Sequence, residues 1–337
     1  MNALAIALAK SPELFPHALD LRSDMVSILR LTRADYESAS FLDGRIAIPA
    51  RPTRLLPWSL LAQAVGESNL HESCHFLFHI GHVGSTLLSR LLGKHPALFS
   101  LREPEILRTL ARATREPDNE PQLAVFLKLW SRTFDPHARV LLKASSFVSG
   151  HAGKLLARPY APKAIAMGVA PESYLATIFG GANSPGEAAA LAPFRLARLN
   201  RCLGCDWKPD DLSTGEVVAA GWACETLALA EAARQAGAQV QTLNFDRFLA
   251  QPDACLALAF EHLGVRAGSD EISAILAGPE MKSYSKAPEF SYDLATRRAE
   301  LDEGRSRHAS EIRHGLRWLD RVAREFPQLE SALALFG

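Results

Sequence analysis

The fold is decided by one stretch of the sequence, Phe76-Leu77-Phe78-His79-Ile80-Gly81-His82-Val83-Gly84-Ser85-Thr86. Its first five residues form a mostly apolar run that ends at glycine, as a buried strand of a parallel sheet does. From residue 85 to residue 92, apolar residues recur at helical spacing, which predicts a helix directly after the turn. A strand, a glycine-containing turn and a helix in this order are typical of a phosphate-binding site.

The turn supplies the donors that an anion needs. Glycine lets the backbone curl so that several N–H groups point at one spot, and the helix start adds the positive end of its dipole. Two hydroxyl groups follow, on Ser85 and Thr86. We predict that phosphate or sulfate binds at Gly81, His82, Val83, Gly84, Ser85 and Thr86. The alternative is a glycine-rich turn that only joins strand to helix.

The turn lacks the lysine of nucleotide-hydrolysing P-loops. Those turns carry Gly-Lys-Ser/Thr, and the lysine reaches the terminal phosphates. Here Gly84 is followed directly by Ser85. The sequence therefore disfavours a kinase or a nucleoside triphosphatase.

The rest of the chain alternates between strand-like and helix-like stretches. Apolar runs at residues 139–142, 164–167 and 238–243 predict three more strands. Three stretches between or around them, residues 171–179, 185–202 and 215–235, predict helices. Strands separated by helices imply right-handed crossovers. We predict an α/β protein with a three-layer P-loop fold, a mostly parallel sheet and additional C-terminal helices.

Both ends of the chain differ from this pattern. Residues 1–74 hold short mixed segments, a strand-like run at 45–48 and then three prolines, so we expect loops and short strands. We predict that residues 1–74 are an extension packed on the core, and that residues 75–337 form one P-loop domain. From residue 269 onward the pattern predicts a helix, a polar loop and a final helix at 309–326.

Composition narrows the class of protein. The 337 residues include 37 Lys plus Arg and 37 Asp plus Glu, a balance that disfavours nucleic acid as the main partner. No apolar run approaches the ~18 residues that a membrane span needs.

The five cysteines are odd in number, and a chain of this length needs no disulfides, so we expect reduced thiols in the cytoplasm. The pair Cys202 and Cys205 stands alone, and we expect no metal site.

Several motifs, taken in order, resemble those of the sulfotransferases of the P-loop superfamily. The first is residues 79–92, followed by Leu101-Arg102-Glu103-Pro104. The second is Ala170-Pro171-Glu172-Ser173 with Thr177, and the third is Asn244-Phe245-Asp246-Arg247-Phe248 with Leu263-Gly264-Val265. The resemblance covers residues 76–265. The stretch 284–289, Tyr-Ser-Lys-Ala-Pro-Glu, is similar to poorly characterised bacterial members.

The resemblance implies a donor, 3′-phosphoadenosine 5′-phosphosulfate, whose phosphosulfate end the first motif binds. It implies sulfonate transfer to an acceptor, a small molecule or a peptide, that the sequence does not name. Two basic positions of the family differ here: His82 stands at one and Val169 at the other. The rival hypothesis is therefore a non-catalytic or divergent P-loop protein that binds a nucleotide or anion. The sequence does not predict the oligomeric state.

Three residues are candidates for catalysis. The resemblance implies that Glu103 is the general base; alternatively it caps the following helix or pairs with Arg102. Lys143 ends a strand, where open α/β sheets build their sites, and would steady the transferring group; alternatively it is solvated. His82, if protonated, would replace the missing cation; alternatively it is neutral and only forms hydrogen bonds.

The remaining cofactor-binding candidates come from the second motif and from a late loop. Thr177 is placed at the 3′-phosphate by the resemblance, and Ser285 and Lys286 belong to a loop that would close over it. We predict that Lys143 and Lys286 both reach the turn. If so, neutralising either weakens nucleotide binding by about 1.5–3 kcal/mol.

A basic stripe at helical spacing, Arg195, Arg198 and Arg201, has two interpretations. It either faces a bound anion or forms a solvated helix face, and the sequence favours the solvated face.

Overall fold

The computed structural model describes residues 3–46, 53–113, 119–284, 287–291 and 294–336. Its centre is a parallel sheet in the order β5(Leu98–Arg102), β6(Arg139–Lys143), β4(His75–His79), β7(Ala164–Gly168) and β8(Val240–Asn244). Every residue of β4 and β7 is buried, which explains why these runs are mostly apolar rather than alternating. The predicted α/β class with a parallel sheet is confirmed.

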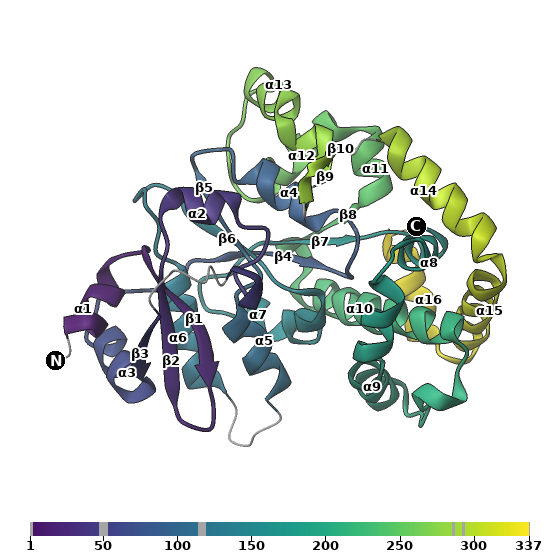
Figure 1. The fold of residues 1–337 in the computed structure, drawn as a ribbon, viewed down its shortest axis with the longest axis horizontal. Coiled ribbons are helices and arrows are strands. Elements are labelled where there is room, and N and C mark those ends of the chain that lie inside the picture. The colour runs from purple at the N-terminus through teal and green to yellow at the C-terminus, as the bar shows by residue number, and fades with distance from the viewer. Residues whose placement is uncertain (1–2, 47–52, 114–118, 285–286, 292–293, 337) are drawn as a thin grey trace.

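Helices cover both faces of this sheet (Figure 1). On one face lie α4(Ser85–Leu92) and α12(Pro252–His262), and on the other α7(Ala152–Leu156) and α10(Thr214–Ala236). The connections between the strands also contain α5(Glu105–Arg112), α6(Glu120–Trp130), α8(Pro171–Gly180) and α9(Ser184–Leu203), and α11(Phe245–Ala250) follows β8. Among the described residues, none of the helices is long and apolar enough to cross a membrane.

The N-terminal part contains more regular structure than the sequence predicts. An antiparallel sheet of β1(Leu14–Asp20), β2(Met25–Arg30) and β3(Arg54–Pro57) packs with α1(Ala3–Lys10) and α3(Trp58–Gly66), and α2(Arg33–Ser38) follows β2. The predicted strand at 45–48 is wrong as far as it is described, because residues 44–46 form a 3₁₀ turn. The Asp43 carboxylate accepts the N–H of Arg45 at 3.0 Å and closes that turn.

The C-terminal part holds a helix that the sequence analysis misses. After α13(Ser269–Ala277) come the short strands β9(Ser283–Tyr284) and β10(Ala287–Ser291), then α14(Leu294–Arg307), α15(Ala309–Glu325) and α16(Pro327–Leu333). The predicted polar loop is therefore wrong over α14. Gly304 lets α14 approach α8 closely, since a Cβ atom there would lie 2.6 Å from the Ala176 carbonyl oxygen.

One hydrophobic cluster connects these parts. It extends from Ala5 in α1 to Phe336 near the C-terminus and includes the strands of the central sheet. The division of the chain at residue 74 stays a prediction.

The arginine stripe of α9 does not form a solvated face, so that interpretation is wrong. Arg195 is buried, and its Nε donates to Glu225 Oε1 of α10 at 2.8 Å. Arg198 also bonds Glu225, and only Arg201 is exposed. The sequence of α9 alone does not show this, because the acidic partner comes from another helix.

Candidate functional site

The turn after β4 has a backbone that requires glycine. Gly81 and Gly84 have φ values of +92° and +67°, in the left-handed region. A Cβ atom on Gly84 would lie 2.1 Å from the ring of Phe245. His82, which is not glycine, also has a positive φ of +54°. Strained non-glycine residues of this kind concentrate at functional sites.

The turn offers unused hydrogen-bond donors. The N–H of Gly81 donates to His79 Nδ1 at 3.0 Å. Within the described residues, the N–H groups of residues 82–87 have no acceptor in the protein. The hydroxyl of Thr86 is buried and likewise has no hydrogen-bond partner in the described chain. Buried donors without partners are uncommon, so the turn is built to receive an acceptor-rich group such as phosphate or sulfate.

A cavity of about 550 Å³ adjoins the turn. Besides residues 82–87, its wall includes His79, Glu103 and Lys143 from the sheet edge, Thr177 from α8, and Phe245 from α11. Helix α14 completes the wall with Arg297, Glu300, Leu301, Glu303, Gly304 and Arg307, followed by His308. This volume suits a ligand of nucleotide size.

Glu103 and Lys143 form a buried ion pair in this wall. They follow or end the neighbouring strands β5 and β6, whose register pairs Arg102 with Lys143. The Glu103 N–H donates to the Lys143 carbonyl at 2.7 Å, which holds Glu103 at a φ of +53°. Burial opposes the ionisation of Glu103, but Lys143 and His79 outweigh it and keep its pKa well below the usual range.

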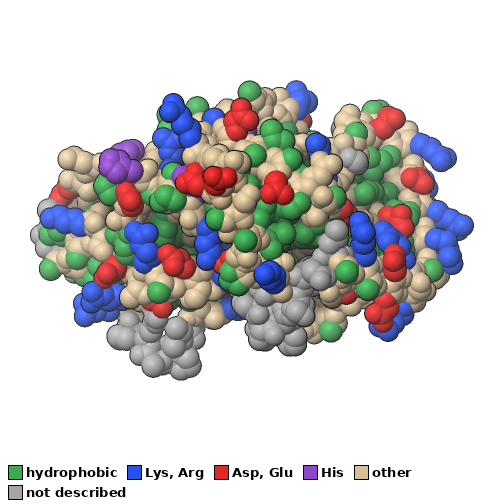
Figure 2. Space-filling model, turned by 90° about the horizontal axis from the view of Figure 1, so that it is seen from above, with side chains coloured by type: hydrophobic (Ala, Val, Ile, Leu, Met, Phe, Trp, Pro, Cys, Tyr) green, Lys and Arg blue, Asp and Glu red, His purple; other side chains and the backbone are tan. Residues whose placement is uncertain are grey.

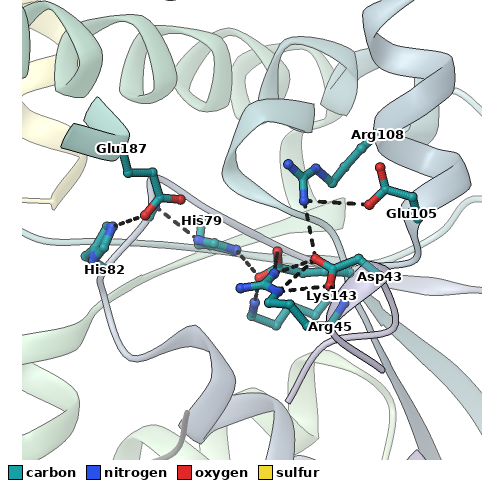
Figure 3. A network of polar contacts seen from close by, with 10 residues as sticks. Asp43, Arg45, His79, His82, Glu105, Arg108, Lys143 and Glu187 are labelled. Atoms are coloured by element: carbon teal, nitrogen blue, oxygen red, sulfur yellow. Dashed lines mark hydrogen bonds and ion pairs between the residues drawn. The ribbon is translucent and has the colours of Figure 1, made fainter. Parts of the chain in front are cut away.

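The ion pair continues into a chain of alternating charges (Figure 3). Arg45 Nη2 lies 3.9 Å from Glu103 Oε2 and 2.5 Å from Asp43 Oδ2. Arg108 Nη1 lies 3.3 Å from the same Asp43 oxygen. The N-terminal part therefore contributes charged side chains directly to the surroundings of Glu103.

His82 faces an acidic residue from α9. Its Nε2 lies 3.4 Å from Glu187 Oε2, and the two side chains lie side by side in Figure 3. Like Lys143, His82 thus already has an acidic neighbour in the wall of the site.

The structure brings most of the predicted residues to one cavity. His82, Val83, Gly84, Ser85, Thr86, Glu103, Lys143 and Thr177 line it. Gly81 lies in the turn but faces a smaller neighbouring cavity, and the Thr177 hydroxyl donates to the Ser173 carbonyl at 2.7 Å. Ser285 and Lys286 lie outside the described residues. The functional roles of all these residues stay predictions.

Two of the alternatives named for these residues, and the position of Val169, can be compared with the geometry. Glu103 pairs with Lys143 and not with Arg102, which donates instead to carbonyl oxygens of α2 and the residue after it. Lys143 has no exposed surface, so a solvated strand end is wrong. Val169 is buried, and its carbonyl accepts the indole N–H of Trp222 at 3.0 Å.

Sequence reasoning missed several wall residues. His79 is buried, and its Nε2 lies 3.7 Å from Glu103 Oε1. Arg297 is buried, donates from Nε to Asp246 Oδ1 at 2.9 Å, and lies over the Phe245 ring at 4.7 Å. A polar residue at the end of an apolar run was a usable signal for His79, whereas nothing local marks Arg297.

The comparisons with known proteins concern the fold alone. No family model and no curated protein matches the sequence. The likeness is to sulfotransferases. Mouse sulfotransferase SULT7A1, complexed with PAP, has a TM-score of 0.45 and 12% identity over 81% of this chain and 92% of that chain. Sulfotransferase STF9 from Mycobacterium avium has a TM-score of 0.39 and 13% identity over 73% and 79%.

A third solved structure is the sulfotransferase domain from the curacin biosynthetic pathway. Its TM-score is 0.38, with 15% identity over 72% of this chain and 99% of that chain. At identities of 12–15%, the comparisons show the fold alone and assign no role to any residue of this chain.

Proposed function

We propose that this chain is a sulfotransferase-like enzyme that transfers sulfonate from 3′-phosphoadenosine 5′-phosphosulfate to an acceptor. One observation carries the proposal: the turn with unused donors and the buried Glu103–Lys143 pair lie in the wall of the same cavity. The motif order of the sequence supports this choice of anion. An anion site beside a carboxylate and a lysine is what transfer of a charged group requires.

The residues of the cavity fit the donor. The N–H groups of residues 82–87 and the hydroxyls of Ser85 and Thr86 would hold its phosphosulfate end. Arg297 offers a buried guanidinium to a second phosphate. When bound, the donor supplies a sulfonate whose bond to the phosphate oxygen breaks as the acceptor oxygen bonds to sulfur.

Glu103 takes the proton that the acceptor hydroxyl loses. While Lys143 is bonded to it, its depressed pKa makes it a weak base. An anion in the turn attracts the same Lys143 ammonium, because both lie in one cavity wall. Withdrawal of Lys143 from Glu103 raises the carboxyl pKa and strengthens the base at the moment when the donor is in place.

Transfer of a radiolabelled sulfonate to a panel of phenols, alcohols, amines and tyrosine peptides tests the proposal. We expect transfer by the wild type and a loss of about 100-fold or more with Glu103→Gln. Glu105→Gln is the matched control, since Glu105 lies two residues away, faces Arg108 and lines neither cavity. Equal transfer by Glu103→Gln contradicts the role of Glu103.

The rival function, a divergent P-loop protein that binds an anion without transferring it, has one observation in its favour. Two basic groups of the site already have acidic neighbours: His82 faces Glu187 and Lys143 bonds Glu103. Donor binding without label transfer to any acceptor supports this rival.

A further inference from the structure

A smaller cavity of about 100 Å³ lies on the other side of Glu103. It shares His79, His82, Glu103 and Ser184 with the large cavity, so the carboxylate stands at the boundary between the two. The rest of its wall is mixed: it includes the apolar or aromatic Phe41, Phe147, Tyr174 and Leu191, the cationic Arg45, Arg108 and Arg195, and the polar Ser145, Ser146 and Glu187. If the donor occupies the large cavity, the acceptor must approach Glu103 from this side.

The segment that bears Phe41 and Arg45 is hydrogen-bonded to the end of β5. The Leu42 N–H donates to the Arg102 carbonyl at 2.7 Å, and the Glu105 N–H donates to the Leu42 carbonyl at 3.4 Å. These two bonds connect Leu42 to residues on either side of Glu103 in the chain. A wall fixed in this way preserves its geometry before any ligand arrives.

Arg45 is the pre-organised group of this wall. Its Nε and Nη2 both bond the Asp43 carboxylate, at 2.9 Å and 2.5 Å, and Asp43 is itself only 2% exposed. Its guanidinium carbon lies 3.3 Å from the centre of the Phe41 ring. One edge of the guanidinium is thus fixed by a buried carboxylate and one face by an aromatic ring.

The other edge of Arg45 is open. The side chain is 55% exposed, and its Nη1 has no hydrogen-bond partner among the residues that the structure describes. Nη2, which bonds Asp43, lies 3.9 Å from Glu103 Oε2, so the guanidinium of Arg45 is next to the base. The exposed Arg112, which does not line the cavity, has its guanidinium carbon 5.2 Å from the centre of the Phe147 ring.

The geometry points to an acceptor that carries an anionic group, a carboxylate, together with an apolar ring and the hydroxyl that receives the sulfonate. Arg45 binds the carboxylate through its open edge, as planar guanidinium groups do, and the rings of Phe41 and Phe147 pack on the apolar part. This inference rests on the proposed function for the identity of the reaction. It gives the N-terminal part a role in selecting the acceptor.

Binding of two matched phenols tests the inference by calorimetry, with and without saturating 3′-phosphoadenosine 5′-phosphate. The probes are 4-hydroxyphenylacetate and its neutral amide, 4-hydroxyphenylacetamide. We expect the wild type to bind the carboxylate about 10- to 100-fold more tightly than the amide. Arg45→Gln should abolish this preference, and Arg45→Lys should restore part of it.

Arg30→Gln is the matched control, because Arg30 is an exposed arginine of the same N-terminal part and pairs with Glu13. It should keep the full preference. Equal binding of the two probes by the wild type, binding of neither, or an equal loss for both in Arg45→Gln overturns the inference. A failure to bind 3′-phosphoadenosine 5′-phosphate instead contradicts the proposed function, while the titrations without nucleotide still test Arg45.

Discussion

Replacement of Lys143 by methionine tests how much the buried Glu103–Lys143 ion pair contributes to the free energy of unfolding. Methionine keeps most of the side-chain volume but leaves Glu103 without its main cation. Removing one partner of a buried pair costs about 3–5 kcal/mol of the free energy of unfolding. His79 Nε2 and Arg45 Nη2 remain near the Glu103 carboxylate oxygens, at 3.7 and 3.9 Å. We therefore expect a loss at the lower end of this range, about 3 kcal/mol.

The loss should be visible as a shift of the melting temperature. An unfolding entropy of about 2.1 cal/mol/K per residue over 337 residues converts about 3 kcal/mol into a fall of about 4 °C. The pair depresses the folded-state pKa of Glu103, so its contribution is present above the unfolded carboxyl pKa of about 4.3. The difference between wild type and Lys143→Met should therefore be largest near pH 7 and narrow below about pH 4.

Thermal unfolding followed by circular dichroism between about pH 3 and pH 8 measures both effects. The control is the double variant Lys143→Met/Glu103→Gln, which removes both charges and should recover most of the lost stability. A melting temperature unchanged at pH 7 refutes the reasoning, and so does a double variant that is as unstable as Lys143→Met alone.

Three further predictions concern the turn and the base. Glu103→Gln should leave binding of 3′-phosphoadenosine 5′-phosphate nearly intact while label transfer falls by about 100-fold, and a parallel loss of binding argues against a role in proton transfer. Gly84→Ala should weaken nucleotide binding at least about 10-fold, because a Cβ atom there meets an aromatic ring at 2.1 Å, whereas Gly186→Ala, with open space around it, should not. His82→Lys should tighten nucleotide binding by about 10-fold despite the nearby Glu187; an unchanged affinity in calorimetry places position 82 away from the anion.

The features predicted correctly from the sequence are those that depend on neighbours in the chain. The strand, turn and helix around Gly84 follow from local glycine and apolar patterning, and the structure shows them where expected. The positions of Glu103 and Lys143 near the carboxyl ends of neighbouring strands also follow from the sequence, but their ion pair was not predicted.

The features missed depend on partners far away in the sequence. The turn at residues 44–46 is closed by the Asp43 carboxylate, and the preceding Leu42 donates its N–H to the Arg102 carbonyl. The strand-like pattern at 45–48 does not show these contacts. Helix α14 carries many charges and little apolar periodicity, and it is positioned by close packing on α8. The burial of Arg195 requires Glu225 from another helix.

Calorimetry with 3′-phosphoadenosine 5′-phosphate, ATP and GTP in parallel tests the central claim most directly. The missing Walker lysine after Gly84 and the donor-rich turn predict that 3′-phosphoadenosine 5′-phosphate binds more tightly than either triphosphate, and without magnesium. Binding of ATP that is equal or tighter and depends on magnesium contradicts the account and places the protein with the kinases and nucleoside triphosphatases.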